Sequence, residues 1–130
     1  MKAKDEIDEI LRRYGSKKEV DAIALSSKNG VPIASHLKKE EENESFSTLS
    51  ATMLGASEVI FSGFEREDPD FIVGYSDDSV LLIKEVGSNT VLSILGDSDK
   101  EKEMMEEMEE MASKLSELEE TFKTMEVLKK

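Results

Sequence analysis

Few side chains in this sequence have the types and spacing that catalysis requires. His36 is the only histidine and there is no cysteine, so a cysteine nucleophile and a thiolate metal site are both excluded. No glycine-rich loop is followed by Lys-Ser or Lys-Thr, which excludes a P-loop for nucleotide phosphates. Glu40, Glu41 and Glu42 lack the alternating ligands and turn glycine of a calcium loop and are expected to be solvated. The sequence therefore predicts no catalytic residue, no metal site and no cofactor.

The elements that would position a functional surface are predicted in the order helix, strand, strand, helix, strand, strand, strand, helix. Ile7, Ile10, Leu11 and Tyr14 fall at helical spacing behind a charged opening. Gly15 is well placed to end that short helix. The first helix is therefore expected to cover a sheet.

An Asn-Gly pair between two apolar runs predicts a hairpin. Val20 to Ser27 is the first strand, and Val31 to His36 is the second. Asn29 and Gly30 supply the positive φ angles that a tight two-residue turn requires. Pro32 cannot donate a hydrogen bond to a neighbouring strand, so the second strand is expected at an edge of the sheet.

The next helix is nearly free of charge. A charged loop, Lys38 to Glu44, leads into it, with Asn43 as the expected N-cap, and the helix is predicted to end at about Ser62. It carries no charge from Ser45 to Ser57, whereas a surface helix normally has one apolar and one charged face. Both sides are therefore expected to be covered, one by the chain's own sheet and the other by a second protein.

Two stripes of side chains divide this uncharged helix. One stripe is assigned to the sheet and comprises Phe46, Leu49, Met53, Ala56 and Ile60. The other is assigned to the equivalent helix of a partner and comprises Ser50, Leu54, Ser57 and Phe61. Small Ser50 and Ser57 would let the two helices approach closely. A single wide buried face within a monomer is the alternative interpretation.

Three further strands are predicted in quick succession, over Asp70 to Ser76, Ser79 to Val86, and Thr90 to Leu95. Their connections are short, so they are expected to form an antiparallel meander. The run Val80 to Ile83 is apolar at consecutive positions, which indicates a strand buried on both faces.

The first strand of this meander forms the second sheet edge if the strands lie in chain order. Neither lysine nor proline protects that edge from pairing with another strand. Together with the partner-facing stripe, this edge is the predicted dimer interface, and its residues are Phe71, Ile72, Val73 and Tyr75.

The last helix is predicted from about Asp99 to the end of the chain. Apolar residues recur along it at alternating spacings of four and three, which is a heptad seam; they are Met104, Met108, Met111, Leu115, Leu118, Phe122 and Met125. The helix would be about 50 Å long, against about 20 to 25 Å for a five-stranded sheet. Either its first half lies on the sheet beside the first helix and its tail frays, or its overhang pairs with another chain.

Composition and charge limit the classes of partner. At 130 residues the chain is long enough for one domain, taken as residues 1–130. Its formal net charge of -13 would repel both a nucleic-acid backbone and an anionic bilayer. No apolar run approaches the length of a membrane span, and acidic residues near Met1 argue against a signal peptide. Absence of cysteine fits a reducing compartment, so a cytoplasmic protein is expected.

The hairpin Ala24 to Ser35, the run Leu49 to Glu58, the meander with Gly87 and the order of elements resemble the Roadblock family, which is named after dynein light chains. The resemblance spans about Asp5 to Glu110. It implies an α+β, three-layer, profilin-like fold, in which a five-stranded antiparallel sheet has one helix on one face and two on the other. It also implies a dimer made by the middle helix and the third strand.

The resemblance further implies binding to small GTPases, since some family members accelerate hydrolysis and others act as scaffolds. A non-catalytic homodimeric regulator or scaffold of a Ras-like GTPase is therefore expected. Arg66, just after the middle helix, is better placed than Arg12 or Arg13 for an arginine finger, but no catalytic role is assigned to it. The alternatives are a structural adaptor joined to a larger assembly through its strand edge and C-terminal helix, and a small-ligand sensor, for which the apolar strands offer few polar groups.

Overall fold

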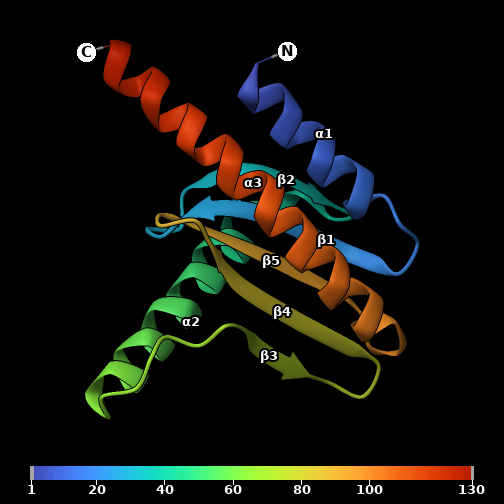
Figure 1. Cartoon of the computed structure of the whole chain (residues 1–130). Helices are drawn as coiled ribbons and strands as arrows, with labels where there is room; N and C mark the ends of the chain where they lie inside the picture. The colour runs from blue at the N-terminus through green and yellow to red at the C-terminus, as the bar shows by residue number, and fades with distance from the viewer. Residues whose placement is uncertain (1, 130) are drawn as a thin grey trace.

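The computed structural model describes residues 2–129, with side chains up to Leu118. Within that range the chain forms three α-helices and one antiparallel sheet of five strands (Figure 1). The elements are α1 (Ala3–Gly15), β1 (Val20–Ser27), β2 (Pro32–Leu37), α2 (Asn43–Gly63), β3 (Ile72–Tyr75), β4 (Ser79–Val86), β5 (Thr90–Asp97) and α3 (Glu101–Lys129). Short 3-10 helices precede α2 and α3, at Glu40–Glu42 and Ser98–Lys100. This is the predicted α+β order of elements.

The sheet has the strand order β2-β1-β5-β4-β3, so β2 and β3 are its two edges, as predicted. Helices α1 and α3 cover one face and α2 covers the other, which gives three layers (Figure 1). The strand β4 is buried on both faces: Val80 and Leu82 pack beneath α1 and α3, whereas Ile83 packs beneath α2. Burial on both faces therefore explains why consecutive residues of this strand are apolar, as predicted from the sequence.

The larger part of the core lies between the sheet and the α1/α3 layer. Leu11 from α1 and Met108 and Met111 from α3 are completely buried there. Met104 and Leu115 are also buried, and Leu118 is partly buried against the same cluster. The heptad seam thus packs on the sheet and α1 as far as Leu118. Its last two residues, Phe122 and Met125, lie outside the described side chains, so pairing of the tail with another chain stays a prediction.

Two local predictions in the first half of the chain are wrong in detail. The hairpin turn contains Lys28, Asn29 and Gly30, and only Gly30, at φ 86°, has a positive φ among these residues. The Gly30 N–H donates to the Ser27 carbonyl over 2.9 Å, which is typical of a three-residue hairpin loop ending in a left-handed glycine. Asn43 is the first residue of α2 rather than its N-cap, because the 3-10 helix of Glu40–Glu42 leads directly into α2.

Candidate partner-binding surface

The outward face of α2 carries most of the exposed large apolar side chains. Nine such side chains occur among the residues whose side chains are described, and six of them lie on α2 or directly after it. These six are Leu49, Met53, Val59, Ile60, Phe61 and Phe64. A surface helix normally has a charged outward face, so this concentration makes the outward face of α2 a candidate contact surface.

The two stripes of α2 face in the opposite directions to those predicted from the sequence. Ser50 and Leu54, which were assigned to a partner, are 3% and 1% exposed beneath α2. Leu54 and Ala51 pack against Ile83 and Val91 of the sheet. Ser57 is half-buried at the flank, where its hydroxyl donates to the Leu54 carbonyl over 3.0 Å, and Phe61 is exposed.

Close packing of α2 on the sheet explains the reversal. The buried side is made largely of short side chains, Ser47, Ser50 and Ala51, so the helix backbone can approach the strands closely. The larger side chains of the stripe assigned to the sheet then point outward. Leu49, Met53, Ala56 and Ile60 are exposed, and Phe46 is half-buried. We name these four exposed residues the α2 stripe.

The edge strand β3 adjoins α2 and pairs with β4 alone. Val73 and Tyr75 are exposed, whereas Phe71 and Ile72 are half-buried against the two core clusters. The strand begins at Ile72, so Phe71 lies just before it, with the Lys84 ammonium 4.6 Å from its ring centre. Tyr75 donates to Glu101 over 2.8 Å, and this hydrogen bond raises the pKa of the Tyr75 hydroxyl. The outer side of β3 remains available for pairing with another strand.

A charged cluster joins the C-terminal half of α2 to the sheet. The Lys28 ammonium lies 2.6 Å from Glu85 of β4 and 3.6 Å from Glu58 of α2. Burial raises the pKa of Glu58, the charge of Glu85 raises it further, and Lys28 opposes both. Carboxylate oxygens of Glu58, Glu85 and Asp68 lie within 4.8 Å of one another, as in a cation site. Lys28 already supplies a positive charge to two of these three carboxylates.

Replacing Lys28 with methionine is expected to destabilise the chain by about 1 kcal/mol at neutral pH, since these groups are partly exposed. A raised pKa in the folded state means that stability falls as pH rises above the ordinary value of 4.5. Without Lys28, the repulsion between Glu58 and Glu85 deepens that fall. Urea unfolding should therefore show a larger loss at neutral pH than below pH 4.5. Lys28→Arg should keep most of the stability, and an equal loss at both pH values for Lys28→Met would contradict this account.

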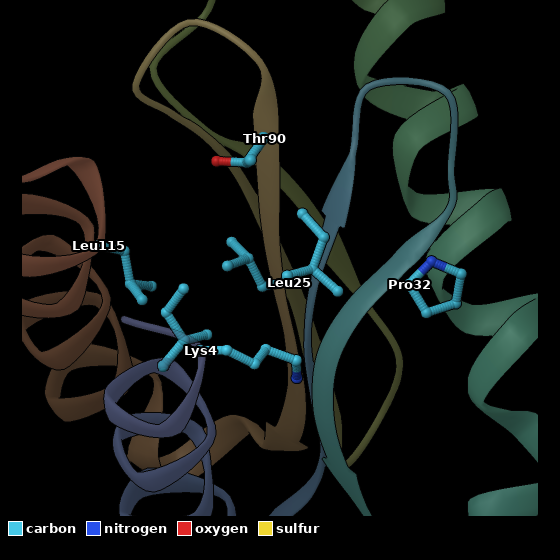
Figure 2. Close-up of a pocket in the computed structure, with 7 residues that line it drawn as sticks. Lys4, Leu25, Pro32, Thr90 and Leu115 are labelled. Atoms are coloured by element: carbon cyan, nitrogen blue, oxygen red, sulfur yellow. The ribbon is translucent and has the colours of Figure 1, made fainter. Parts of the chain in front are cut away.

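A hollow of about 290 Å³ lies on the other face of the sheet (Figure 2). Leu25 of β1, Leu115 of α3 and Lys4 of α1 line it. Its polar groups already have partners within the chain: the Lys4 ammonium contacts Asp8 at 2.6 Å, and the Thr90 hydroxyl donates to the Val86 carbonyl at 2.7 Å. The hollow therefore offers a ligand mainly apolar contact, which is a weak basis for a small-ligand sensor.

The other candidate residues occupy varied positions. Arg12 and Arg13 are exposed on α1, across the sheet from α2, whereas Arg66 is exposed directly after α2. His36 is half-buried, and its Cβ lies close to the position that a side chain at Gly15 would occupy. Glu40, Glu41 and Glu42 are exposed, as predicted for a solvated segment.

The antiparallel sheet lies between α2 on one face and α1 and α3 on the other. It leaves an apolar helix face and an open strand edge exposed, which is an arrangement suited to a protein-interaction domain. The chain belongs to the Roadblock/LC7 domain family, whose family model matches residues 6–96. This family has GTPase-regulating or adaptor roles and is regulatory rather than catalytic.

Solved structures confirm the fold. MglB of Myxococcus xanthus is 18% identical, with a TM-score of 0.83 over 91% of this chain and 90% of that one. A structure described as MglB with a tetrameric arrangement is 15% identical, with a TM-score of 0.82 over 92% and 91%. Profilin IA of Acanthamoeba castellanii is 13% identical, with a TM-score of 0.59 over 87% and 95%, so the fold is profilin-like as predicted.

Sequence comparison with curated proteins gives no significant match. In the described part of the chain, no helix is both long enough and apolar enough to cross a membrane.

Proposed function

We propose that this protein is a cytoplasmic, homodimeric and non-catalytic regulator or scaffold that binds a small Ras-like GTPase. Membership of the Roadblock/LC7 domain family supports the GTPase as the class of partner. The observation that carries the dimer is the α2 stripe beside the open edge of β3. Two copies related by a two-fold axis would pair their α2 helices antiparallel and join their β3 strands into one sheet.

The interface proposed here differs from the one predicted from sequence in its helix residues. Leu49, Met53, Ala56 and Ile60 replace the buried pair Ser50 and Leu54. Ser57 and Phe61 stay at its flank, and the β3 residues keep their proposed role. A surface formed by both α2 helices would be the docking platform for the GTPase. Docking there would reshape the switch loops of the GTPase or hold the GTPase in an assembly.

Light scattering over a range of protein concentrations tests the dimer. The expected result is a mass of about twice 14.5 kDa for the full chain and for a chain shortened after Leu118. Shortening further would remove first Leu118 and then Leu115 and Met111 from the core cluster, so the shortened chain ends after Leu118. A monomer in both would refute the α2–β3 dimer, and a dimer of the full chain alone would assign association to the C-terminal tail.

Affinity capture with the full chain tests the partner. A protein with a P-loop and Ras-like sequence should be retained, and its binding should then be measured in the GTP and GDP forms. Retention of other proteins without any GTPase would favour the second candidate, a structural adaptor. The observation favouring an adaptor is the continuation of α3 beyond the sheet (Figure 1).

A further inference from the structure

A groove of about 560 Å³ lies where α2 begins, between that helix and the ends of β1, β2 and β5. Its apolar lining comes from Ala22, Leu37 and Leu95 of the sheet and Phe46 and Leu49 of α2. Leu49 also belongs to the α2 stripe, so the groove is continuous with the proposed dimer interface. A groove of this kind can receive an apolar side chain from a partner.

The other end of α2 presents such a side chain. Phe64 is 78% exposed, the largest fraction among the exposed large apolar residues described. It is held in place by the closure of the helix, in which the N–H of Glu65 donates to the Ser62 carbonyl and the N–H of Arg66 donates to the Phe61 carbonyl, over 3.0 and 2.9 Å.

Glu65 adopts the left-handed conformation, with φ 58°, that this closure requires and that glycine normally supplies. A non-glycine residue in this region is strained, and such strain is often kept where a side chain must be presented in one position. The backbone thus fixes Phe64 at the end of the helix.

Antiparallel pairing brings the two features together. The α2 helix has 21 residues and is about 31 Å long. In a two-fold pair of helices, residues equally distant from the crossing point on either side lie opposite one another. If the helices cross between Met53 and Ala56 of the α2 stripe, Phe64 of one copy lies opposite residues 42 to 48 of the other. That segment includes Ser45 and Phe46 of the groove.

One lysine at the groove is available to an acidic group of a second copy. Lys38 and Lys39 lie at the rim of the groove, together with Asp21 and Glu42. These four groups leave the rim without net charge. Asp21 is 3.4 Å from Lys38, whereas Lys39 has no ion pair among the described residues. Phe64 is followed by four exposed charged residues, of which Glu65, Glu67 and Asp68 are acidic and Arg66 is basic. Because the copies repel each other through their net charge of -13, a local attraction at this point would favour one orientation.

We infer that the groove is the receptor for Phe64 of a second copy of this chain, with Lys39 facing the acidic residues that follow Phe64. This inference rests on the proposed homodimer and specifies how its two copies lock together. Each dimer would contain two such contacts, because the two-fold axis repeats every contact.

The absence of cysteine permits a direct test by disulfide formation between two single-cysteine variants. Ser45→Cys protein is mixed with Ser62→Cys protein, which keeps Phe64, and the mixture is oxidised mildly. Within one chain these positions are about 26 Å apart along α2, so a disulfide between them reports contact between copies. The matched control replaces Ser45→Cys with Arg12→Cys, which is exposed on α1 across the sheet. The expected result is a rapid mixed disulfide for Ser45→Cys and little for Arg12→Cys.

Affinity measurements complete the test. Phe64→Ser is expected to raise the dissociation constant of the dimer at least tenfold, whereas Phe64→Leu keeps most of the affinity. Lys39→Glu should weaken the dimer, and Glu67→Lys in the same chain should restore it. A stable dimer without the Ser45–Ser62 disulfide would overturn this inference and leave the proposed homodimer standing. A monomeric wild-type chain would overturn both.

Discussion

Replacing Ile60 with glutamate is expected to convert the dimer to a monomer without unfolding the chain. Ile60 lies in the α2 stripe and is 61% exposed in the single chain, so the substitution should change monomer stability by less than about 0.5 kcal/mol. In the dimer, each of two copies would lose the burial of an isoleucine side chain, at about 1.5 to 2 kcal/mol each. The sum corresponds to a dissociation constant about 100- to 1000-fold higher.

The matched control for this variant is Val31→Glu. Val31 is also apolar and 61% exposed, but it lies beside the β2 edge of the sheet, opposite β3. Both variants gain one negative charge, so a general effect of charge would weaken both dimers equally. Light scattering should show dissociation for Ile60→Glu alone, and loss of GTPase binding should accompany it if the platform needs both copies. A dimer that survives Ile60→Glu would exclude the α2 stripe as the interface.

Local patterns were enough to predict most of the fold. The predicted bounds of β1 and β4, Val20 to Ser27 and Ser79 to Val86, match the structure because apolar runs are bounded there by turn residues. The edges of the sheet followed from Pro32 and from the short connections of the meander. These features depend on neighbours in the sequence, and so a single sequence contains the information for them.

The orientation of α2 depends on tertiary packing, which periodicity alone does not specify. Both stripes are uncharged, so hydrophobic patterning favours the stripe with larger side chains as the buried one. The structure buries the side with Ser47, Ser50 and Ala51, because short side chains let the helix lie close to the sheet. Burial of serines beneath exposed Leu49 and Ile60 is explained if a second protein covers the outward face.

A second apolar face on α2 was therefore predicted from the sequence, but the residues that form it were not. The uncharged run indicated that two sides of α2 would be covered, and the structure places the sheet on the side that had been assigned to the partner. The groove at the start of α2 was missed because its lining comes from three strands and a helix that are separated in the sequence. Exposed Phe64 beside an acidic segment was the available local signal for its counterpart.

Leu54→Ala is expected to destabilise the single chain by about 2.5 to 4 kcal/mol. Leu54 is 1% exposed and packs with Ala51, Ile83 and Val91 in the small cluster beneath α2. Truncation removes buried methyl groups and leaves a cavity, and the small cluster has few other residues to compensate. This loss is a large fraction of the stability of a domain of this size, so the urea midpoint should fall clearly.

Leu49→Ala is the matched control for Leu54→Ala, since it makes the same substitution in the same helix at a position that is 61% exposed. Both should be measured in the Ile60→Glu chain, so that dimer formation does not contribute to stability. Leu49→Ala is then expected to cost less than about 1 kcal/mol. The stripe assignment made from sequence predicts the reverse order, with Leu49 as the core residue, so the two urea midpoints decide which side of α2 meets the sheet. Leu54→Glu cannot probe the interface, because it would bury an unpaired charge in the core and unfold the chain.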